Sequence, residues 1–463
     1  MKKIQEYVNK INRVKEPKFV DWLLVGLIIV FCYFSFNHAD ILCTASHGRD
    51  LVYCILQGKF MEFYDFTQST AVYCITVYIL FAIWSLPIMV IYKVIGIEMW
   101  AVLDFMSIPY PVLMWYKLLP TLFYFAIAFL LYKIVMEIKH DANIAKWISF
   151  LFISSPIAIF SQFIFGQYDS LGLFLAVWAF YMFIKKKYYS FSILCSLAIT
   201  FKLFAIFLFI PLILLIEKRV FHIIKYGLIS ISGYLITTAM FLGSQGYRNA
   251  ISFSGDIAPR LFEVGIATTM GTISLFTVAI MLICIWAYVK NITNNDEFFN
   301  YSIYISFAVF GTLFAFILWH PQWVIFLIPF MTLAFMLNNN YNSSLILHSA
   351  MAVGYLGIVP MAFPGNVDAC MLQFGILPKI FGNRAIGNIT DLIQRTGAET
   401  NICYSFFAGA ILVLLVYCFP NNKPKSIPVS DAEQVTFGDR LFVLARPITL
   451  ILFIVPALYV FMR

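Results

Sequence analysis

Long apolar segments follow one another along almost the whole chain, and this feature limits the possible folds more than any other. Hydrophobic residues make up 62% of the 463 residues and charged residues only 12%, which is far more apolar than a water-soluble protein of this length. A helix needs roughly 20 apolar residues to cross a hydrocarbon core about 30 Å thick. We therefore predict an all-α, polytopic membrane protein, because a β-barrel would show short strands of alternating polarity instead. The apolar segments are 20–37, 71–92, 116–136, 145–163, 168–184, 189–201, 203–216, 221–243, 268–289, 299–318, 322–337, 344–362, 401–419 and 443–461.

The positions of Lys and Arg predict how these segments are threaded. The basic segment 1–19 should stay in the cytoplasm, since positive charge is retained on that side. Strict alternation would place several later lysines outside, so we interpret 71–92 as a hairpin or a helix that lies in the outer interface. Segment 189–216 carries positive charge at both ends and is interpreted as two short helices with Lys202 at an outer turn. This threading predicts about 13 transmembrane helices and places roughly twice as many basic residues inside as outside.

The threading also predicts an organisation into modules. A transmembrane module spans 20–243 and includes an outer loop over 38–115, and a second, C-terminal module spans 244–463. The polar, Pro-rich segment 420–442 is expected to be a cytoplasmic linker. The net charge of +8 is explained by topology and lipid contact. Nucleic acid is not expected as a partner, because basic residues interleaved with exposed aromatic residues are absent.

Asp40 is the first candidate functional residue, because it follows the first apolar segment at the outer mouth of the membrane. An ionisable residue at this depth is costly unless it faces water or a partner. The alternative is an ordinary interfacial acid just clear of the bilayer. The same outer loop carries His47 and Asp50, which are also candidates, although a solvated loop explains most of its polar residues.

Two further constellations interrupt apolar helices on the side predicted to be outside. In Gly166-Gln167-Tyr168-Asp169, glycine can end one helix and Asp169 can cap the next. A capping aspartate can still line a cavity. Lys202 stands within an otherwise apolar stretch and needs an anion or a route to the headgroups, so it either snorkels or contacts a lipid phosphate.

A fourth constellation is Trp319-His320-Pro321-Gln322-Trp323. Tryptophans around a turn are often an interfacial belt, but His320 and Gln322 add groups that can bind a sugar or a phosphate. Arg248 and Arg260 lie in the preceding outer loop and can also contact a phosphate. No P-loop, zinc or Ser-His-Asp motif is present.

These residues together resemble the GT-C superfamily of integral-membrane glycosyltransferases. The resemblance is to the branch with dolichyl-phosphate-glucose-dependent glucosyltransferases, the second mannosyltransferase of glycosylphosphatidylinositol synthesis, and bacterial relatives. Asp40 matches the acid of their first outer loop, which carries interfacial helices. Gly166-Gln167-Tyr168-Asp169 resembles their Gly-Gln-x-Asp element, Lys202 with Pro211 their Lys…Pro helix pair, and His320-Pro321-Gln322-Trp323 their Pro-Gln-Tyr/Trp turn. The likeness covers about residues 20–340.

The resemblance implies an inverting transfer of a hexose from a polyprenyl-phosphate donor to a hydroxyl of a glycan or lipid acceptor. It implies Asp40 as the base and no cofactor. The gathering of unusual residues in the outer loops predicts a site on the outer face of a cell membrane, and the Phe-, Ile-, Lys- and Asn-rich composition suggests a bacterial one. Many family members have a paired acid at this point, whereas Ile41 and Leu42 follow Asp40 here. A second acidic role would then fall to Asp50 or Asp169, and no metal site is predicted, although a divalent metal is not excluded. The competing hypotheses are a transporter or flippase of lipid-linked saccharides and a glycan polymerase or ligase.

Overall fold

The computed structural model describes residues 15–68, 70–96, 108–338, 341–365, 367, 369–382, 387–397, 399–420 and 440–463. Most of the basic segment 1–19, part of the first outer loop (97–107) and most of the linker 420–442 lie outside these residues.

Helices account for nearly all of the described elements, and each apolar segment identified in the sequence coincides with at least one of them. The longer helices are α2 (Phe19–Ser35), α3 (Ala39–Leu56), α5 (Ile75–Val94), α6 (Tyr110–Lys139), α7 (Ala142–Ile153), α9 (Asp169–Ile184), α10 (Tyr188–Phe201), α11 (Ala205–Ile216), α12 (Val220–Phe241), α13 (Gln245–Ile257), α14 (Leu275–Val289), α15 (Asn295–Phe316), α17 (Tyr341–Ala362), α20 (Thr400–Tyr417) and α22 (Ile451–Met462). The shorter ones are η1 (Phe60–Glu62), α4 (Phe63–Phe66), α8 (Pro156–Ile159), η2 (Phe160–Phe165), η3 (Ala258–Leu261), η4 (Pro321–Phe326), α16 (Ile328–Ala334), η5 (Phe335–Leu337), η6 (Ala369–Phe374), α18 (Leu377–Phe381), α19 (Ile389–Gln394) and α21 (Arg440–Ile448).

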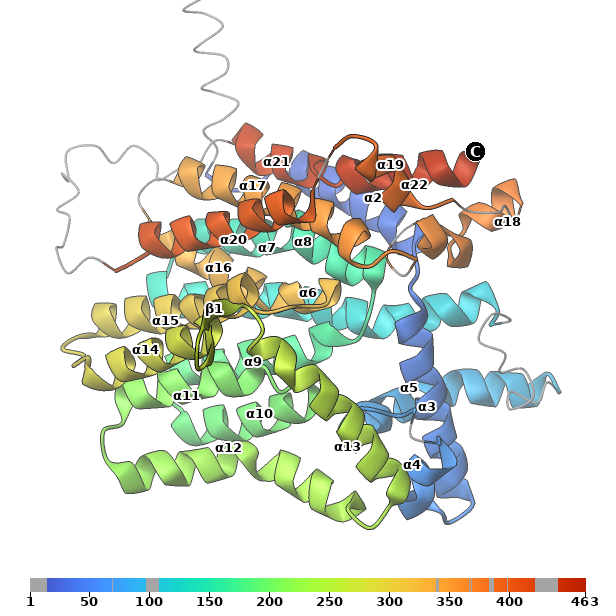
Figure 1. The fold of residues 1–463 in the computed structure, drawn as a ribbon, viewed down its shortest axis with the longest axis horizontal. Helices are drawn as coiled ribbons and strands as arrows, with labels where there is room; N and C mark the ends of the chain where they lie inside the picture. The colour runs from blue at the N-terminus through green and yellow to red at the C-terminus, as the bar shows by residue number, and fades with distance from the viewer. Residues whose placement is uncertain are drawn as a thin grey trace, which may run out of the picture.

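The length and polarity of these helices identify a polytopic membrane protein. Within the described ranges, seven helices are long and apolar enough to cross a membrane, or nine if each of two bent pairs forms one span. Five more apolar helices have 10–17 residues, and the predicted count of about 13 crossings would need such short helices to cross as well. Most of the helices lie broadly parallel, whereas α3 and α13 run across them (Figure 1).

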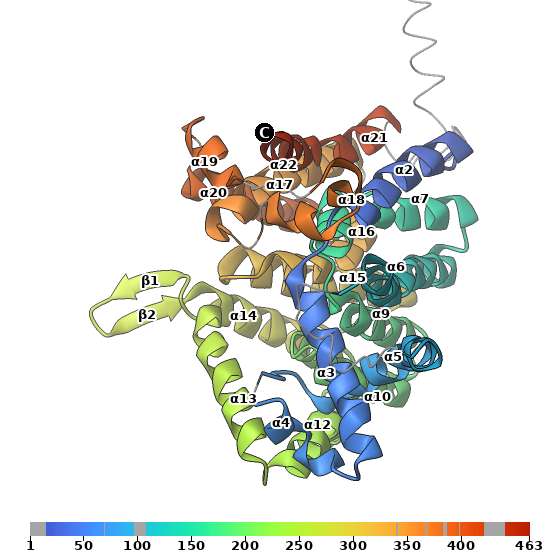
Figure 2. The ribbon, with the colours of Figure 1, turned by 90° about the vertical axis from the view of Figure 1, so that its right-hand side faces the viewer.

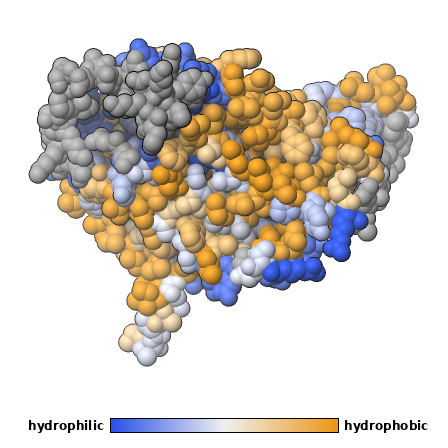
Figure 3. Space-filling model, turned by 90° about the horizontal axis from the view of Figure 1, so that it is seen from above, coloured by the Kyte–Doolittle hydropathy of each residue, from blue (hydrophilic) through white to orange (hydrophobic). Residues whose placement is uncertain are grey.

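The surface agrees with this assignment. Large apolar side chains are exposed along α12 and α14, as at Phe221 (87% exposed) and Leu282 (62%). The face shown in Figure 3 is largely a broad hydrophobic band, with hydrophilic atoms gathered toward its edges. Exposed apolar surface of this extent is explained by contact with lipid.

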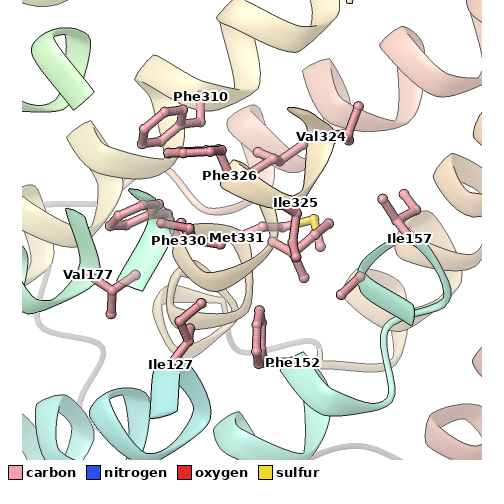
Figure 4. Packing of buried hydrophobic residues seen from close by; sticks show 14 of the residues in the cluster. Ile127, Phe152, Ile157, Val177, Phe310, Val324, Ile325, Phe326, Phe330 and Met331 are labelled. Carbon is pink, nitrogen blue, oxygen red and sulfur yellow. The ribbon is translucent and has the colours of Figure 1, made fainter. Parts of the chain in front are cut away.

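The centre of the bundle is built around the broken helix η4–α16. Phe326, Phe330 and Met331 of this segment are fully buried, and the rings of Phe326 and Phe330 lie against Phe310 of α15 (Figure 4). The rings of Phe310 and Phe330 stack with centroids 5.1 Å apart. This packing fixes the segment that begins at the His320–Gln322 turn.

Within segment 71–92 the chain forms one continuous helix, α5, from Ile75 onward rather than a hairpin, and α5 is one of the seven helices long and apolar enough to cross a membrane. It packs on α3, where Gly48 leaves so little room that a Cβ would lie 2.6 Å from the Cβ of Phe81. α5 runs in the direction of α6, and both are seen end-on in Figure 2. Trp84 and Trp115 join them: their rings stack at 4.6 Å, and each indole N–H donates to the other residue's carbonyl.

The start of segment 268–289 is not helical. Strands β1 (Gly265–Thr268) and β2 (Gly271–Ser274) pair antiparallel, with Gly265 opposite Ser274, and the hairpin projects from the body in Figure 2. Gly271 has φ +139°, a conformation that side chains other than glycine rarely adopt. Gly271 and the β-branched residues Thr272 and Ile273 disfavour a helix at this point, so α14 begins only at Leu275.

The first and last parts of the described chain are joined by a buried ion pair. The Arg440 guanidinium donates to both carboxylate oxygens of Asp21, at 2.6–3.1 Å. Farther along, Arg446 is fully buried and donates to Ser154 and contacts His348. These contacts dock α21 against α2, α7 and α17.

Candidate functional site

Five chain corners that are far apart in the sequence meet at one end of the helices. They are the turn from α2 to α3, the turn from η2 to α9, the break between α10 and α11, the short helix η3, and the turn from α15 to η4. Direct contacts join them: His38 stacks on Phe165 at 3.9 Å, Gln322 donates to Gln167 at 2.8 Å, and the Leu318 N–H donates to the Arg260 carbonyl. We call Asp40, Gln167–Asp169, Lys202, Arg260 and His320–Gln322 the corner cluster.

Asp40 presents an accessible carboxylate to this cluster. It lies in the first turn of α3, and His38 caps that helix by accepting the Asp40 N–H through Nδ1 at 3.1 Å. The same imidazole nitrogen is 3.5 Å from the carboxylate, whose side chain is 42% exposed. Asp40 is close enough to Lys202 and Asp169 for its charge to act on both. The carboxylate is thus oriented by its neighbours and remains open to a substrate.

Lys202 and Asp169 form a buried ion pair. The ammonium nitrogen is 3.1 Å from Asp169 Oδ1, and the two side chains are 11% and 3% exposed. The rings of Tyr73, Tyr168 and Trp323 surround the ammonium at 5.1–5.4 Å, in reach of cation–π attraction. Lys202 therefore reaches the cluster with an internal counter-ion, whereas the sequence interpretation offered snorkelling to the headgroups or contact with a lipid phosphate.

A chain of amides links two of the corners. Gln322 donates to the Gln167 side-chain oxygen at 2.8 Å, and Gln167 donates to the Tyr73 hydroxyl at 3.1 Å. The preceding Gly166 has φ +74°, which lets the chain turn from η2 into α9. The turn thus fixes the direction of the Gln167 and Asp169 side chains.

Unsatisfied polar atoms are concentrated here. Within the described ranges, half of the buried side-chain N and O atoms without a hydrogen-bond partner belong to Tyr168, Asp169, Trp319 and Gln322. For Asp169 this holds despite the ion pair, since Lys202 approaches without hydrogen-bond geometry. Buried polar groups in proteins are nearly always satisfied, and exceptions mark places where water or a ligand binds. These unsatisfied atoms make the corner cluster the candidate binding site.

His320 is a neutral member of the cluster. Its ring packs against Trp323 and Phe363, each at 5.1 Å. Burial, and then the positive charges of Arg260 and Lys202, lower the pKa of His320 to about 4. At neutral pH it offers a hydrogen bond rather than a positive charge.

An apolar cavity of about 190 Å³ opens beside the cluster. Its walls include Tyr234 of α12, Tyr247 of α13, Phe204 and Trp323, and Lys202 is the charged residue among its lining residues. The cavity thus places an apolar surface and a polar cluster next to each other.

Two predicted site residues lie elsewhere. Asp50 is ten residues beyond Asp40, about 15 Å along α3, and its carboxylate is 3.3 Å from His47 Nδ1. Arg248 donates to the carbonyls of Leu242 and Gly243 near the start of α13. No contact of either with Asp40, Lys202 or His320 is found among the described residues.

Sequence reasoning missed Tyr73, His38 and Lys117 as neighbours of the cluster, whereas Trp323 belonged to the fourth constellation. Lys117 gave the same signal as Lys202, a lysine at an apolar stretch. It stands at the start of segment 116–136 and was not singled out as a candidate. Tyr73 gave no signal, because an aromatic residue before an apolar helix is common.

No group of three or more His, Cys, Asp or Glu residues that could hold a metal ion occurs in the part of the chain that the structure describes. No protein-family model matches the chain, and no curated protein is similar to it.

Proposed function

We propose that the protein is an inverting glycosyltransferase that moves a hexose from a polyprenyl-phosphate donor to a hydroxyl of a glycan or lipid acceptor. One observation carries the proposal. An accessible carboxylate, a buried Lys–Asp pair, an arginine and a neutral histidine meet at one end of membrane helices, beside an apolar cavity. Such a combination suits an amphiphilic substrate with an anionic centre and an isoprenoid chain. It also supports the GT-C resemblance of the same corners.

In the proposed reaction, the Asp40 carboxylate accepts the proton of the acceptor hydroxyl. The hydroxyl oxygen attacks the anomeric carbon, and the bond from that carbon to the phosphate oxygen breaks on the opposite side. The electron pair leaves with the polyprenyl phosphate, so the configuration at the anomeric carbon inverts. A phosphate is a stable leaving anion, and no second acid is required. General-base assistance of this kind contributes about 10²–10⁴-fold.

The remaining cluster residues would bind the donor. Arg260 and the Lys202–Asp169 pair would stabilise the charge that develops on the phosphate, since preorganised charge is most effective in a water-poor site. His320 and Gln322 would donate hydrogen bonds to phosphate or sugar oxygens. The first isoprene units would lie in the apolar cavity along Tyr234 and Tyr247.

A lipid-saccharide transporter is the second candidate, because broken helices meet at the cluster. The pair α2 and α3 bends by 66° at the break just before Asp40, and α10 and α11 are interrupted at Lys202. Interrupted helices at a binding site are typical of secondary transporters. A transporter would move the intact lipid-linked saccharide, whereas the transferase would release polyprenyl phosphate.

The test is to incubate the purified protein with a panel of polyprenyl-phosphate hexoses and an extract containing glycan and lipid acceptors. We expect release of polyprenyl phosphate with at least one donor and a loss of about 100-fold or more in Asp40→Asn. Glu62→Gln is the matched control, since it removes an exposed carboxylate paired only with Lys59. Near-normal turnover in a folded Asp40→Asn would exclude Asp40 as the base. Translocation without cleavage would favour the transporter, and cleavage only of lipid-linked oligosaccharides would favour a polymerase or ligase.

A further inference from the structure

Lys117 is a fully buried lysine of α6 whose ammonium contacts backbone carbonyls. It donates to Tyr33 at 2.8 Å, Phe163 at 2.7 Å, Cys32 at 3.4 Å and Phe36. Among the ion pairs of the described residues, none includes Lys117. A buried ammonium must be compensated, and here carbonyl dipoles supply that compensation.

The four carbonyls belong to two chain segments that end at the corner cluster. Cys32 and Tyr33 lie in the last turn of α2 and Phe36 is its C-cap, where the helix dipole favours a cation; the Cys32 carbonyl also accepts the Phe36 N–H. The fourth, from Phe163, lies in the wide helical turn η2. Lys117 therefore joins the C-terminal ends of both segments.

Each of these ends leads directly to a carboxylate of the cluster. Asp40 is four residues after Phe36, and Asp169 is six residues after Phe163. The lysine stem also fills the space beside the second corner, since a Cβ at Gly166 would lie 3.3 Å from Lys117 Cε. The two corners then touch through the stacked rings of His38 and Phe165.

We propose that Lys117 is a positioning residue that holds the Asp40 carboxylate in register with the Asp169–Lys202 pair. It contacts the backbone of both corners and does not itself touch the substrate. An N–H donor is required here because a side chain without one leaves the α2 carbonyls and Phe163 without a common donor. The catalytic part of this inference rests on the proposed function of Asp40.

The test compares Lys117→Met and Lys117→Arg with Lys218→Met. Lys218 is a matched control, because its ammonium also bridges two helix ends, donating to Leu214 at 2.7 Å and Ala287 at 2.9 Å, on helices α11 and α14. We expect kcat to fall about 100-fold in Lys117→Met while the donor KM changes less than threefold. Lys117→Arg should recover at least a tenth of the lost kcat, and Lys218→Met should leave both constants near those of the parent.

A variant in the Asp40→Asn background separates positioning from general damage. If Lys117 acts through Asp40, adding Lys117→Met to Asp40→Asn should reduce the residual kcat by less than threefold. A full additional loss would refute the inference, as would parental kcat in a folded Lys117→Met. If Lys117→Met fails to fold, the same comparison is made with Lys117→Arg.

A readout independent of turnover distinguishes failure of this inference from failure of the proposed function. Amide hydrogen exchange in residues 37–41 and 166–170 should be at least tenfold faster in Lys117→Met than in the parent and Lys218→Met. Unchanged exchange at both corners would overturn the positioning role. If the parent protein releases no polyprenyl phosphate but amide exchange is still faster in Lys117→Met, the proposed function is refuted. The inference that Lys117 holds the two corners then still stands.

Discussion

The Lys202–Asp169 pair gives the sharpest test of how the site is held together. The two charges are 3.1 Å apart and buried. With an effective dielectric constant of about 20, two unit charges at this separation attract by about 5 kcal/mol. Desolvation offsets much of this in the intact pair, but removing one partner leaves the other buried and unpaired, which typically costs about 3–5 kcal/mol.

The expected pattern is therefore strongly non-additive. Lys202→Met and Asp169→Asn should each lower the free energy of unfolding by about 3–5 kcal/mol. The double variant should lie within about 2 kcal/mol of the parent, because no unpaired charge remains and buried pairs contribute little net stability. The double variant should fold but show a donor KM raised at least about tenfold, since one cation of the phosphate site is gone.

The parent, the two single variants and the double variant form a double-mutant cycle. Their unfolding by denaturant is measured in one detergent by intrinsic tryptophan fluorescence. Trp323 borders the pair and provides a local signal. The reasoning would be refuted by single variants as stable as the parent, or by a double variant whose loss equals the sum of the single losses. Either result would mean that the pair is solvated or that the surrounding rings hold Lys202 without Asp169.

Two further predictions concern the corners. Gly166→Ala should lower the free energy of unfolding by about 1–2 kcal/mol, because φ is +74° and the new Cβ would lie 3.3 Å from the Gln162 carbonyl, as circular dichroism against denaturant can measure. Parental stability of Gly166→Ala would show that the turn adapts. The folded-state pKa of His320 is about 4, below its ordinary value of 6.5. The neutral ring therefore favours folding fully above pH 6.5, and that contribution is lost as the pH falls toward 4. Between pH 7 and 5, the parent should lose about 1–2 kcal/mol of stability more than His320→Gln, and parallel pH curves for the two would contradict the buried neutral ring.

Much of the helical framework was predictable because apolar length is a local property. The start of α9 at Asp169 and the end of α10 at Lys202 follow from polar residues that interrupt apolar runs. The β1–β2 hairpin was not predicted, since most of β1 was assigned to an outer loop and β2 to the beginning of the apolar segment 268–289. A continuous apolar run cannot distinguish these alternatives without its neighbours.

The composition of the cluster was only partly predictable, because the sequence reveals which corners are polar but not which of them meet. Asp40 and Asp50 share one helix, yet only Asp40 lies at its cluster end. Arg248 and Arg260 were predicted in one loop, but only Arg260 belongs to the cluster, because Arg248 donates to the carbonyls of the turn just before α13. Lys117 and Lys202 both stand out in apolar surroundings, and only three-dimensional contacts show that one binds carbonyls and the other a carboxylate.

The Arg440–Asp21 pair affects the order in which the helices reach their final packing during synthesis. Asp21 is completely buried in the first helix, and its partner is 419 residues later in the chain. At about 5–20 residues per second, the ribosome needs about 20–80 s to reach Arg440 after Asp21 has emerged. During that time α2 carries an acid without its guanidinium, so its final packing waits for α21. α2, the first helix that the structure describes, is therefore among the last to be completed, and a stalled or shortened chain leaves it open to recognition by quality control.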